Sequence, residues 1–298
     1  MTIRFDNRVA IVTGAGGGLG RQYALDLAAR GAKVVVNDLG GARDGSGGGS
    51  PAAQAVVDEI LAAGGEAMAN GASVTDADAI FAMVEEVKAR WGRIDIMINN
   101  AGILRDRTFS KMTLEDFKLV LDVHLMGSVN CTKAVWELMR EQAYGRILMT
   151  TSSTGLYGNF GQANYGAAKL ALVGLMKTLA LEGAKYNVRV NTVAPLAATR
   201  MTEDLMPPEL LAKMGPETVS PAAVYLVSED APTSVILNAG AGGFEAAHVT
   251  ITKGIHVGAD EMTPETVAAR IAEIRDRTGE VVPDTGAGQG AMALGGQR

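Results

Sequence analysis

The sequence predicts an α/β fold in which helices cover both faces of a parallel sheet. Short apolar runs rich in β-branched residues alternate with helical patterns over most of the 298 residues. The first run, residues 9–12, leads into a glycine-rich turn, a helical pattern and a second run at residues 33–36. Near-continuous apolar strands are typical of a sheet that is buried on both faces. We therefore expect one doubly wound domain with a C-terminal extension.

The same rhythm assigns the remaining elements in order. The expected strands cover residues 9–12, 33–36, 67–69, 94–98, 145–150 and 188–193. The expected helices cover residues 21–29, 52–63, 77–91, 114–141 and 165–185. The stretch 39–51 is longer and richer in glycine than a strand-to-helix turn requires, which favours a flexible spacer.

The C-terminal part follows this rhythm less clearly. Beyond Ala231 the pattern weakens, but Thr263 at an N-cap and Pro264 at the first helical position predict a helix that runs to about Arg275. We expect a domain over residues 1–277 and a flexible tail over residues 278–298.

The composition excludes several classes of function. The net charge is −6 with no basic stripe, so nucleic acid is not an expected partner. No apolar stretch reaches the roughly 18 to 20 residues that cross a bilayer. Cys131 is the only cysteine and the chain starts without the apolar core of a signal peptide, so a cytoplasmic location is expected. The histidines, His124, His248 and His256, form no ligand cluster with cysteine, and no metal is expected.

A nucleotide site is predicted where the first strand meets the first helix. The turn from Thr13 to Gly20 would let the backbone approach a pyrophosphate at the helix N-terminus. Its candidate contact residues are Gly14, Gly17, Gly18, Leu19 and Gly20. Asp38 ends the second strand, where a carboxylate can accept hydrogen bonds from ribose hydroxyls and would repel a 2′-phosphate. NAD is therefore expected rather than NADP, although Arg43 in the following loop leaves NADP open.

An acid/base site is predicted at Tyr165 and Lys169. Their spacing of four residues places the phenol and the ammonium on one face of a helix, where the cation can stabilise a phenolate. A free tyrosine titrates near pH ~10, so catalysis near neutrality needs a shift of about three pKa units, or roughly 4 kcal/mol. The pair alone is also compatible with a solvated helix face.

Further motifs in register give the pair its context. Asn99 to Gly102 follow the fourth strand, at the sheet edge where ligands of doubly wound folds bind, and Ser152 precedes Tyr165 by thirteen residues. Together with the glycine turn and Tyr165-x-x-x-Lys169, this order and spacing resembles the short-chain dehydrogenase/reductase family, whose fold is Rossmann-type. The resemblance implies that Ser152 holds the substrate oxygen, that Tyr165 exchanges its proton, and that Lys169 lowers the tyrosine pKa and binds the nicotinamide ribose. Ser153 is an alternative for the serine role.

The resemblance also implies the remaining contacts with the cofactor. Asn100, Ala101 and Gly102 would line the carboxyl edge of the sheet, with Ser73 and Val74 beside the adenine. Pro195, Leu196 and Thr199 would lie beside the nicotinamide, although Leu196 stands where the family usually has glycine and Thr199 comes one position early.

Four longer segments resemble a narrower group, the dehydrogenase units of peroxisomal multifunctional enzymes of type 2. These segments cover residues 36–41, 99–107, 123–128 and 157–165, within an overall likeness from about Phe5 to Arg275. The resemblance implies oxidation of (3R)-hydroxyacyl-CoA with NAD by a stand-alone dehydrogenase of fatty acid metabolism. Both this group and the present chain carry a histidine, His124, where many family members have an asparagine that holds a proton-relay water. His124 is thus a candidate participant, or else a satisfied core residue.

Several alternatives stay open. Reduction of 3-oxoacyl groups on acyl-carrier protein would be favoured by a basic patch of Arg105, Arg107 and Lys111. Oxidation of a sterol hydroxyl and a redox-sensing nucleotide binder without catalysis are the others. The long apolar helices over residues 114–141 and 165–185 resemble those that pair subunits in the family, which implies a homodimer or homotetramer.

Overall fold

The computed structural model describes residues 2–42, 44–45, 51–197 and 213–294. The chain forms two compact units, Met1–Ala246 and Ala247–Arg298.

The first unit is built on one eight-stranded sheet. Its strands are β1 Val9–Thr13, β2 Lys33–Asn37, β3 Glu66–Asn70, β4 Ile96–Asn99, β5 Gly145–Thr150, β6 Val188–Pro195, β7 Ile236–Gly240 and β8 Gly243–Ala247. They lie in the order β3-β2-β1-β4-β5-β6-β7-β8, and the pairs from β3 to β7 are parallel. Between β7 and β8, Ala241 and Gly242 both have positive φ angles, of 50° and 85°, which suits a tight hairpin.

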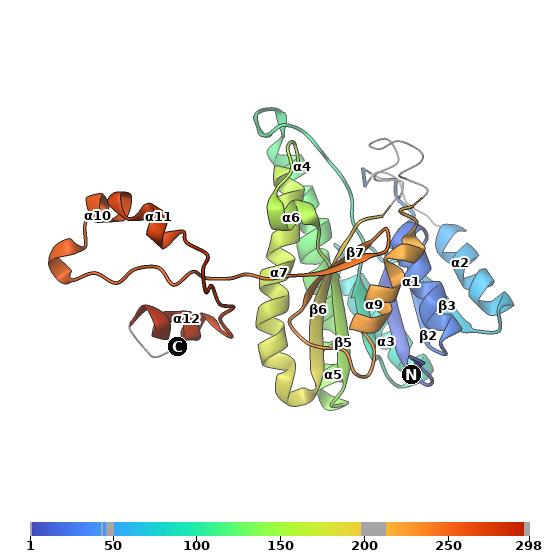
Figure 1. Cartoon of the computed structure of the whole chain (residues 1–298). Helices are drawn as coiled ribbons and strands as arrows, with labels where there is room; N and C mark the ends of the chain where they lie inside the picture. The colour runs from blue at the N-terminus through green and yellow to red at the C-terminus, as the bar shows by residue number, and fades with distance from the viewer. Residues whose placement is uncertain (1, 43, 46–50, 198–212, 295–298) are drawn as a thin grey trace. The chain divides into compact units, whose positions relative to one another are not determined.

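Helices cover both faces of this sheet, so the predicted α/β doubly wound fold is confirmed (Figure 1). The helices of the first unit are α1 Gly18–Ala29, α2 Pro51–Ala62, α3 Ala77–Trp91, α4 Leu114–Leu121, α5 Gly127–Glu141, α6 Ser153–Tyr157, α7 Ala163–Gly183 and α9 Ser220–Leu226. Helix α1 packs with α2 and α9, whereas α3 packs with α5 and α4 packs with α7. The strand order reverses between β1 and β4, and doubly wound sheets bind ligands at the carboxyl ends of such strands.

The predicted long helix over residues 114–141 is interrupted. A π-helix, Asp122–Met126, separates α4 from α5 and carries His124. Thr113 caps the N-terminus of α4, since its hydroxyl accepts a hydrogen bond from the amide of Asp116 at 3.0 Å. Single-turn π-helices within α-helices occur frequently at functional sites.

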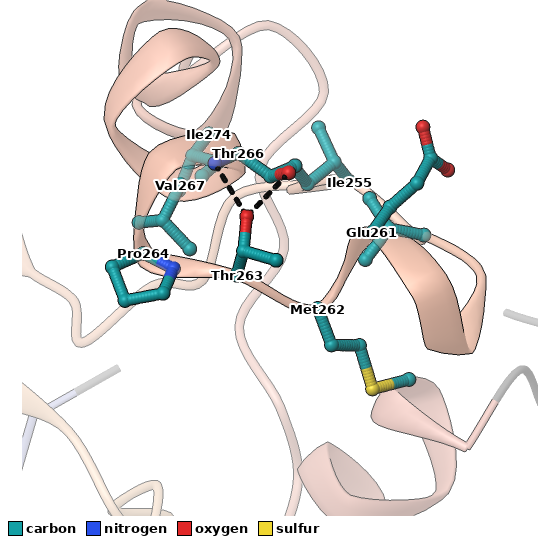
Figure 2. Close-up of a pocket in the computed structure, with 9 residues that line it drawn as sticks. Ile255, Glu261, Met262, Thr263, Pro264, Thr266, Val267 and Ile274 are labelled. Atoms are coloured by element: carbon teal, nitrogen blue, oxygen red, sulfur yellow. Dashed lines mark hydrogen bonds between the residues drawn. The ribbon is translucent and has the colours of Figure 1, made fainter.

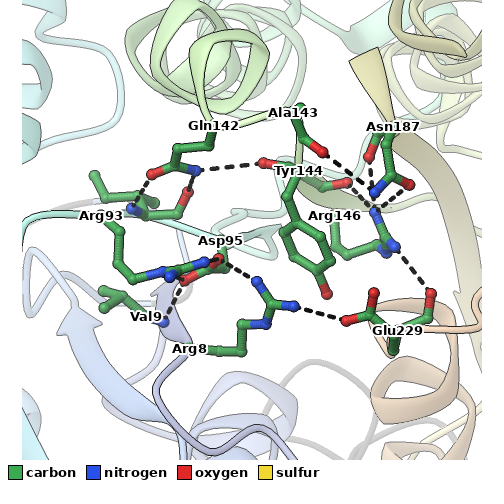
Figure 3. Close-up of polar contacts among 12 residues, drawn as sticks. Arg8, Val9, Arg93, Asp95, Gln142, Ala143, Tyr144, Arg146, Asn187 and Glu229 are labelled. Atoms are coloured by element: carbon green, nitrogen blue, oxygen red, sulfur yellow. Dashed lines mark hydrogen bonds and ion pairs between the residues drawn. The ribbon is translucent and has the colours of Figure 1, made fainter. Parts of the chain in front are cut away.

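At the amino edge of the sheet, opposite the carboxyl ends of the strands, a buried arginine hydrogen-bonds several backbone carbonyls (Figure 3). The Arg146 side chain is fully buried, and its guanidinium donates to the carbonyls of Ser228 at 2.9 Å and Glu229 at 2.9 Å. It also donates to the carbonyls of Gly145 and Asn187, each at 2.8 Å. Tyr144 stacks on the same guanidinium at 4.1 Å. The sequence contained no signal for this cluster.

Asp95 lies at the same edge and is equally buried. Its carboxylate accepts hydrogen bonds from Arg8 at 3.0 Å, from Arg93 at 2.6 and 2.8 Å, and from the backbone amide of Val9 at 2.9 Å. These contacts join the starts of β1 and β4, so the amino edge of the sheet has a structural role. A ligand site is therefore expected at the opposite, carboxyl edge.

The second unit has little core of its own. It contains α10 Pro264–Ala269, α11 Ile271–Ile274 and α12 Gly286–Ala293, and none of its described residues is buried. An apolar groove of about 470 Å³ runs past Ile255, Met262 and Val267 (Figure 2). Helix α12 lies within residues 278–298, which the sequence assigned to a tail, and the predicted domain division stays a prediction.

The predicted helix from Thr263 to Arg275 is correct at its start and wrong in its continuity. The Thr263 hydroxyl accepts a hydrogen bond from the amide of Thr266 at 3.1 Å, as an N-cap should. At Arg270 the backbone leaves the helical range, with φ −107° and ψ 15°. Short helices are marginal without tertiary packing, and no described side chain of this unit is buried.

Candidate active site

The glycine turn lies between β1 and α1, as predicted. Gly14 and Gly18 have positive φ angles of 62° and 53°. A Cβ atom on Gly20 would lie 2.3 Å from the carbonyl oxygen of Gly14, so only glycine fits there. Gly17 caps α1 and brings no side chain to its first amides, while Leu19 packs against the core. These amides can therefore receive an anionic group such as a pyrophosphate.

Asp38 follows β2 and faces this turn. One carboxylate oxygen accepts a hydrogen bond from the amide of Gly16 at 2.8 Å, and the other accepts one from the amide of Gly40 at 2.7 Å. The structure thus brings Asp38 to the glycine turn, as a ribose-binding residue requires. Arg43, the residue that left NADP open, lies outside the described residues.

The segment after β4 supports the turn from the other side. The Asn100 side-chain amide donates to the carbonyls of Thr13 at 2.9 Å and Gly14 at 3.1 Å. The backbone amides of Asn100 and Ala101 both donate to the Thr13 hydroxyl, at 3.0 and 3.1 Å. Sequence reasoning missed Thr13 as an anchor, although its place between strand and turn could have indicated it.

The other predicted cofactor residues lie at the ends of β3 and β6. Val74 is buried, and its carbonyl accepts a hydrogen bond from Asn130 at 2.9 Å, while Ser73 pairs with the Thr75 hydroxyl at 2.9 Å. Pro195 ends β6, and Leu196 is half exposed. Thr199 lies outside the described residues.

Ser152, Tyr165 and Lys169 are brought together where β5 meets α6 and α7. Ser152 caps α6, since its hydroxyl accepts a hydrogen bond from the amide of Thr154 at 3.1 Å. Its side chain also lowers the pKa of Tyr165, whereas Ser153 is exposed, which favours Ser152 for the serine role. A Cβ atom on Gly155 would lie 2.8 Å from the Cβ atom of Lys169, which shows how closely α6 packs on α7.

Lys169 is buried, and its ammonium donates to the carbonyl of Thr150 at 2.6 Å. It lies 5.4 Å from the centre of the Tyr165 ring. Burial lowers the pKa of Lys169 to about 7. Burial thus weakens the preference of this lysine for its charged form.

The pKa of Tyr165 differs from the expectation. Burial of its hydroxyl raises the pKa to about 12, which outweighs the opposite effect of the Ser152 hydrogen bond. The desolvation that weakens the charge of Lys169 also disfavours the phenolate. Within the chain alone Tyr165 is thus a proton donor at neutral pH.

His124 lies behind the tyrosine. Its ring meets the Tyr165 ring edge to face, with 5.2 Å between the centroids. Nε2 contacts the amide of Ile103 at 3.1 Å and its carbonyl at 2.8 Å, and Nδ1 is buried with no hydrogen-bond partner among the described residues. Burial, followed by the charge of Lys169, lowers the pKa of His124 well below its usual value, so the imidazole is neutral.

The loop that carries Gly102 requires a small residue against His124. A Cβ atom on Gly102 would lie 2.3 Å from the imidazole. His124 therefore contacts both Gly102 and Tyr165 and connects two predicted parts of the site. Whether it takes part in proton transfer stays a prediction.

We expect the Lys169→Met variant to have a free energy of unfolding that is up to about 4 kcal/mol higher than that of the wild-type protein at pH 7. The folded pKa of about 7 lies below the ordinary lysine pKa of 10.5, so the unfolded chain binds more protons between these values. The free energy of unfolding of the wild-type protein consequently rises with pH between these two pKa values. In the variant, this dependence on pH is lost. Urea unfolding at pH 7, 8 and 9 measures both effects, with Lys177→Met on the same helix as control. Equal slopes in the two proteins would contradict the prediction.

The described residues contain no group of three or more histidine, cysteine or acidic side chains that could hold a metal ion. None of the helices among them is long and apolar enough to span a membrane.

Comparisons with known proteins agree with this geometry. The short chain dehydrogenase family model matches residues 8–209. A short-chain type dehydrogenase/reductase of Mycobacterium tuberculosis is 51% identical over 274 residues, covering 92% of this chain and 96% of that protein. The peroxisomal multifunctional enzyme type 2 of Mus musculus is 48% identical over 286 residues, covering 95% of this chain but 38% of that protein.

A solved structure adds a ligand-bound neighbour. It is a 7α-hydroxysteroid dehydrogenase in complex with NADH and 7-oxoglycochenodeoxycholic acid, with a TM-score of 0.73 and 30% identity over 80% of this chain and 95% of that one. The expected resemblance is thus confirmed, both to the family and to the dehydrogenase units of the multifunctional enzymes. The chain is a short-chain dehydrogenase/reductase, an oxidoreductase of the family that uses NAD or NADP.

Proposed function

We propose that this enzyme uses NAD and transfers a hydride between it and a 3-hydroxyacyl or 3-oxoacyl-CoA thioester, with 3R stereochemistry. The observation that carries the reaction type is the convergence of Ser152, Tyr165 and Lys169. The acyl-CoA assignment is supported by the likeness to the mouse multifunctional enzyme along 95% of this chain.

The residues of the chain have separate roles in this proposal. Bound NAD supplies the acceptor for the hydride that leaves the carbon bearing the hydroxyl group. Ser152 hydrogen-bonds the substrate oxygen, and Tyr165 accepts the hydroxyl proton during oxidation or returns it during reduction. Lys169 lies next to Tyr165 and would reach the nicotinamide ribose. The glycine turn would hold the pyrophosphate at the start of α1.

The alternatives differ in what supports them. Arg105 belongs to the basic patch that would favour acyl-carrier protein, but its side chain pairs with Asp116 at 3.0 Å and donates to the carbonyl of Asp44 at 2.7 Å. Its charge is therefore already paired, which weakens that alternative. A steroid substrate is favoured by the hydroxysteroid dehydrogenase neighbour. Oxidation of a hydroxysteroid is therefore the second candidate function.

The deciding experiment measures NADH formation from matched (3R)- and (3S)-hydroxyacyl-CoA thioesters, with a free hydroxysteroid and with NADP as comparisons. We expect turnover of the 3R thioester with NAD. Turnover of the steroid alone would replace the proposal by the second candidate. Turnover of the 3S thioester in preference to 3R would overturn the stereochemical assignment.

NAD specificity is expected to depend on Asp38. Removing its carboxylate in the Asp38→Ser variant removes the repulsion of a 2′-phosphate, so the ratio of kcat/KM for NADP to that for NAD should rise at least about tenfold, or ~1.4 kcal/mol. Steady-state kinetics with both cofactors measure this ratio. Asp58→Ser on α2 is the matched control and should leave it unchanged. A ratio that stays constant in Asp38→Ser would remove Asp38 from cofactor selection.

We also propose that the enzyme is a homodimer or homotetramer. Leu114, Met126, Leu170 and Leu181, from α4, the π-helix and α7, are exposed by 73%, 45%, 48% and 56%. Burying such side chains against a second copy would stabilise an oligomer. Light scattering at micromolar concentration should give at least twice the mass of one chain, and a monomer would contradict the proposal. A cytoplasmic location stays a prediction.

A further inference from the structure

Two loops meet beside Tyr165 and are joined by three hydrogen bonds. One loop carries Arg105 to Arg107 after β4, and the other carries Gly161 and Gln162 and leads into the first turn of α7, which holds Asn164. The amide of Arg107 donates to the carbonyl of Gly161 at 2.9 Å, and the Asn164 side chain donates to the carbonyl of Arg105 at 3.1 Å. The Gln162 side chain donates to the carboxylate of Asp106 at 2.7 Å. We call these three bonds the Asp106 clasp.

Gln162 is the centre of the clasp because its amide is held in one orientation. Its oxygen accepts hydrogen bonds from the Thr154 hydroxyl at 2.9 Å and from the Asn159 side chain at 3.0 Å. Only the NH₂ group is then left to face Asp106, and that group requires an acceptor. The oxygen of a carboxylate provides it.

The clasp connects to the elements that hold Ser152 and Tyr165. Thr154, which donates to Gln162, lies in α6, and its amide is bound by the Ser152 hydroxyl. Gln162 caps α7, three residues before Tyr165, and its carbonyl accepts a hydrogen bond from Gly166 at 2.7 Å. One set of contacts therefore runs from Asp106 to the helices that carry Ser152 and Tyr165.

Asp106 also contributes charge. Its carboxylate acts on Tyr165 in the same direction as burial, toward a higher pKa. Of the other groups around the tyrosine, Lys169 comes from the same helix and His124 from the π-helix is neutral. Arg105 is paired with Asp116, and Arg107 is exposed. The negative charge on this side thus comes from an exposed loop residue.

We propose that Asp106 is a positioning residue, which holds Ser152 and Tyr165 in register through Gln162 and places a negative charge on the loop beside Tyr165. This rests on the proposed acid/base role of Tyr165. A negative charge beside Tyr165 disfavours the phenolate, so oxidation is expected to accelerate as the pH rises.

The Asp106→Asn variant tests the charge, because asparagine keeps an acceptor for Gln162. In oxidation of (3R)-hydroxybutyryl-CoA with NAD, we expect the alkaline rise of kcat to move to lower pH by about half a unit or more. Asp106→Glu, which keeps the charge, should leave the profile in place, as should Glu115→Gln, an exposed carboxylate of α4. Gln162→Ala removes the bond to Asp106 together with the bonds to Thr154 and Asn159, and it should lower kcat about tenfold with the KM for NAD unchanged.

A second measurement is independent of turnover. Tyrosinate absorbance of the NAD complex is titrated with pH, and the same titration of Tyr165→Phe is subtracted to isolate Tyr165. A lower titration midpoint in Asp106→Asn supports the proposal, and an unchanged midpoint overturns it. An active Tyr165→Phe variant would instead overturn the proposed function, so the two failures are distinguishable.

Discussion

The Tyr165→Phe variant is expected to lose about 10²- to 10⁴-fold in kcat, the range that general acid/base catalysis contributes. Phenylalanine fills nearly the same volume, so the edge-to-face contact with His124 at 5.2 Å remains and the fold is unchanged. What disappears is the hydroxyl that we propose exchanges the proton. Affinity for NADH should stay within about twofold, because the glycine turn and Asp38 are intact.

The matched control is Tyr157→Phe. Tyr157 ends α6, is 69% exposed and is not part of the predicted site, so its hydroxyl should be dispensable. Stopped-flow or steady-state NADH absorbance measures kcat, and fluorescence titration measures NADH binding. If Tyr165→Phe retained kcat within tenfold of the wild-type value, the acid/base role would have to move to another group.

The second large effect is on stability. The Arg146→Met variant is expected to lower the free energy of unfolding by about 2 to 4 kcal/mol, because it leaves buried and partly buried carbonyl groups without their donor. Those of Ser228, Glu229 and Asn187 lie within 2.8 to 2.9 Å of the guanidinium. Methionine fills the space but donates no hydrogen bond.

Urea unfolding of Arg146→Met measures this loss, with the exposed Arg90→Met on α3 as control. The cluster lies at the amino edge of the sheet, so kcat and KM of the folded variant should equal the wild-type values at low temperature. A loss of less than 1 kcal/mol would mean that water or neighbouring donors replace the guanidinium. A changed KM for NAD would mean that the two edges of the sheet are coupled.

The sequence predicted those elements whose pattern repeats locally. Helix α3 and strand β5 have the predicted bounds, because the apolar period and the flanking turn residues agree there. The helix after Thr263 shows the limit of local signals: its cap is correct, yet it breaks at Arg270 where no buried neighbour supports it. The Arg146 cluster could not be predicted, since Ser228 lies 82 residues away in the chain.

In the site, too, the features set by local spacing were predicted and those set by distant contacts were not. The spacing of Tyr165 and Lys169 placed both side chains on one helix face, and the thirteen residues back to Ser152 were enough to bring the serine to them. Their pKa values were beyond the sequence, because desolvation depends on what the whole fold packs around each group. The same holds for Asp106, which reaches Tyr165 only through the arrangement of two loops.

The Asp38 carboxylate has a consequence for how the enzyme would choose its cofactor. A carboxylate offers about four acceptor positions, and each oxygen here already receives one backbone amide, from Gly16 and Gly40. One position per oxygen therefore remains, which matches a vicinal diol that donates two hydrogens. Since the amides hold the side chain in a single rotamer, recognition of that diol would require no further ordering of the side chain. Preorganisation of the acceptor, as much as repulsion of a phosphate, would then select the ribose.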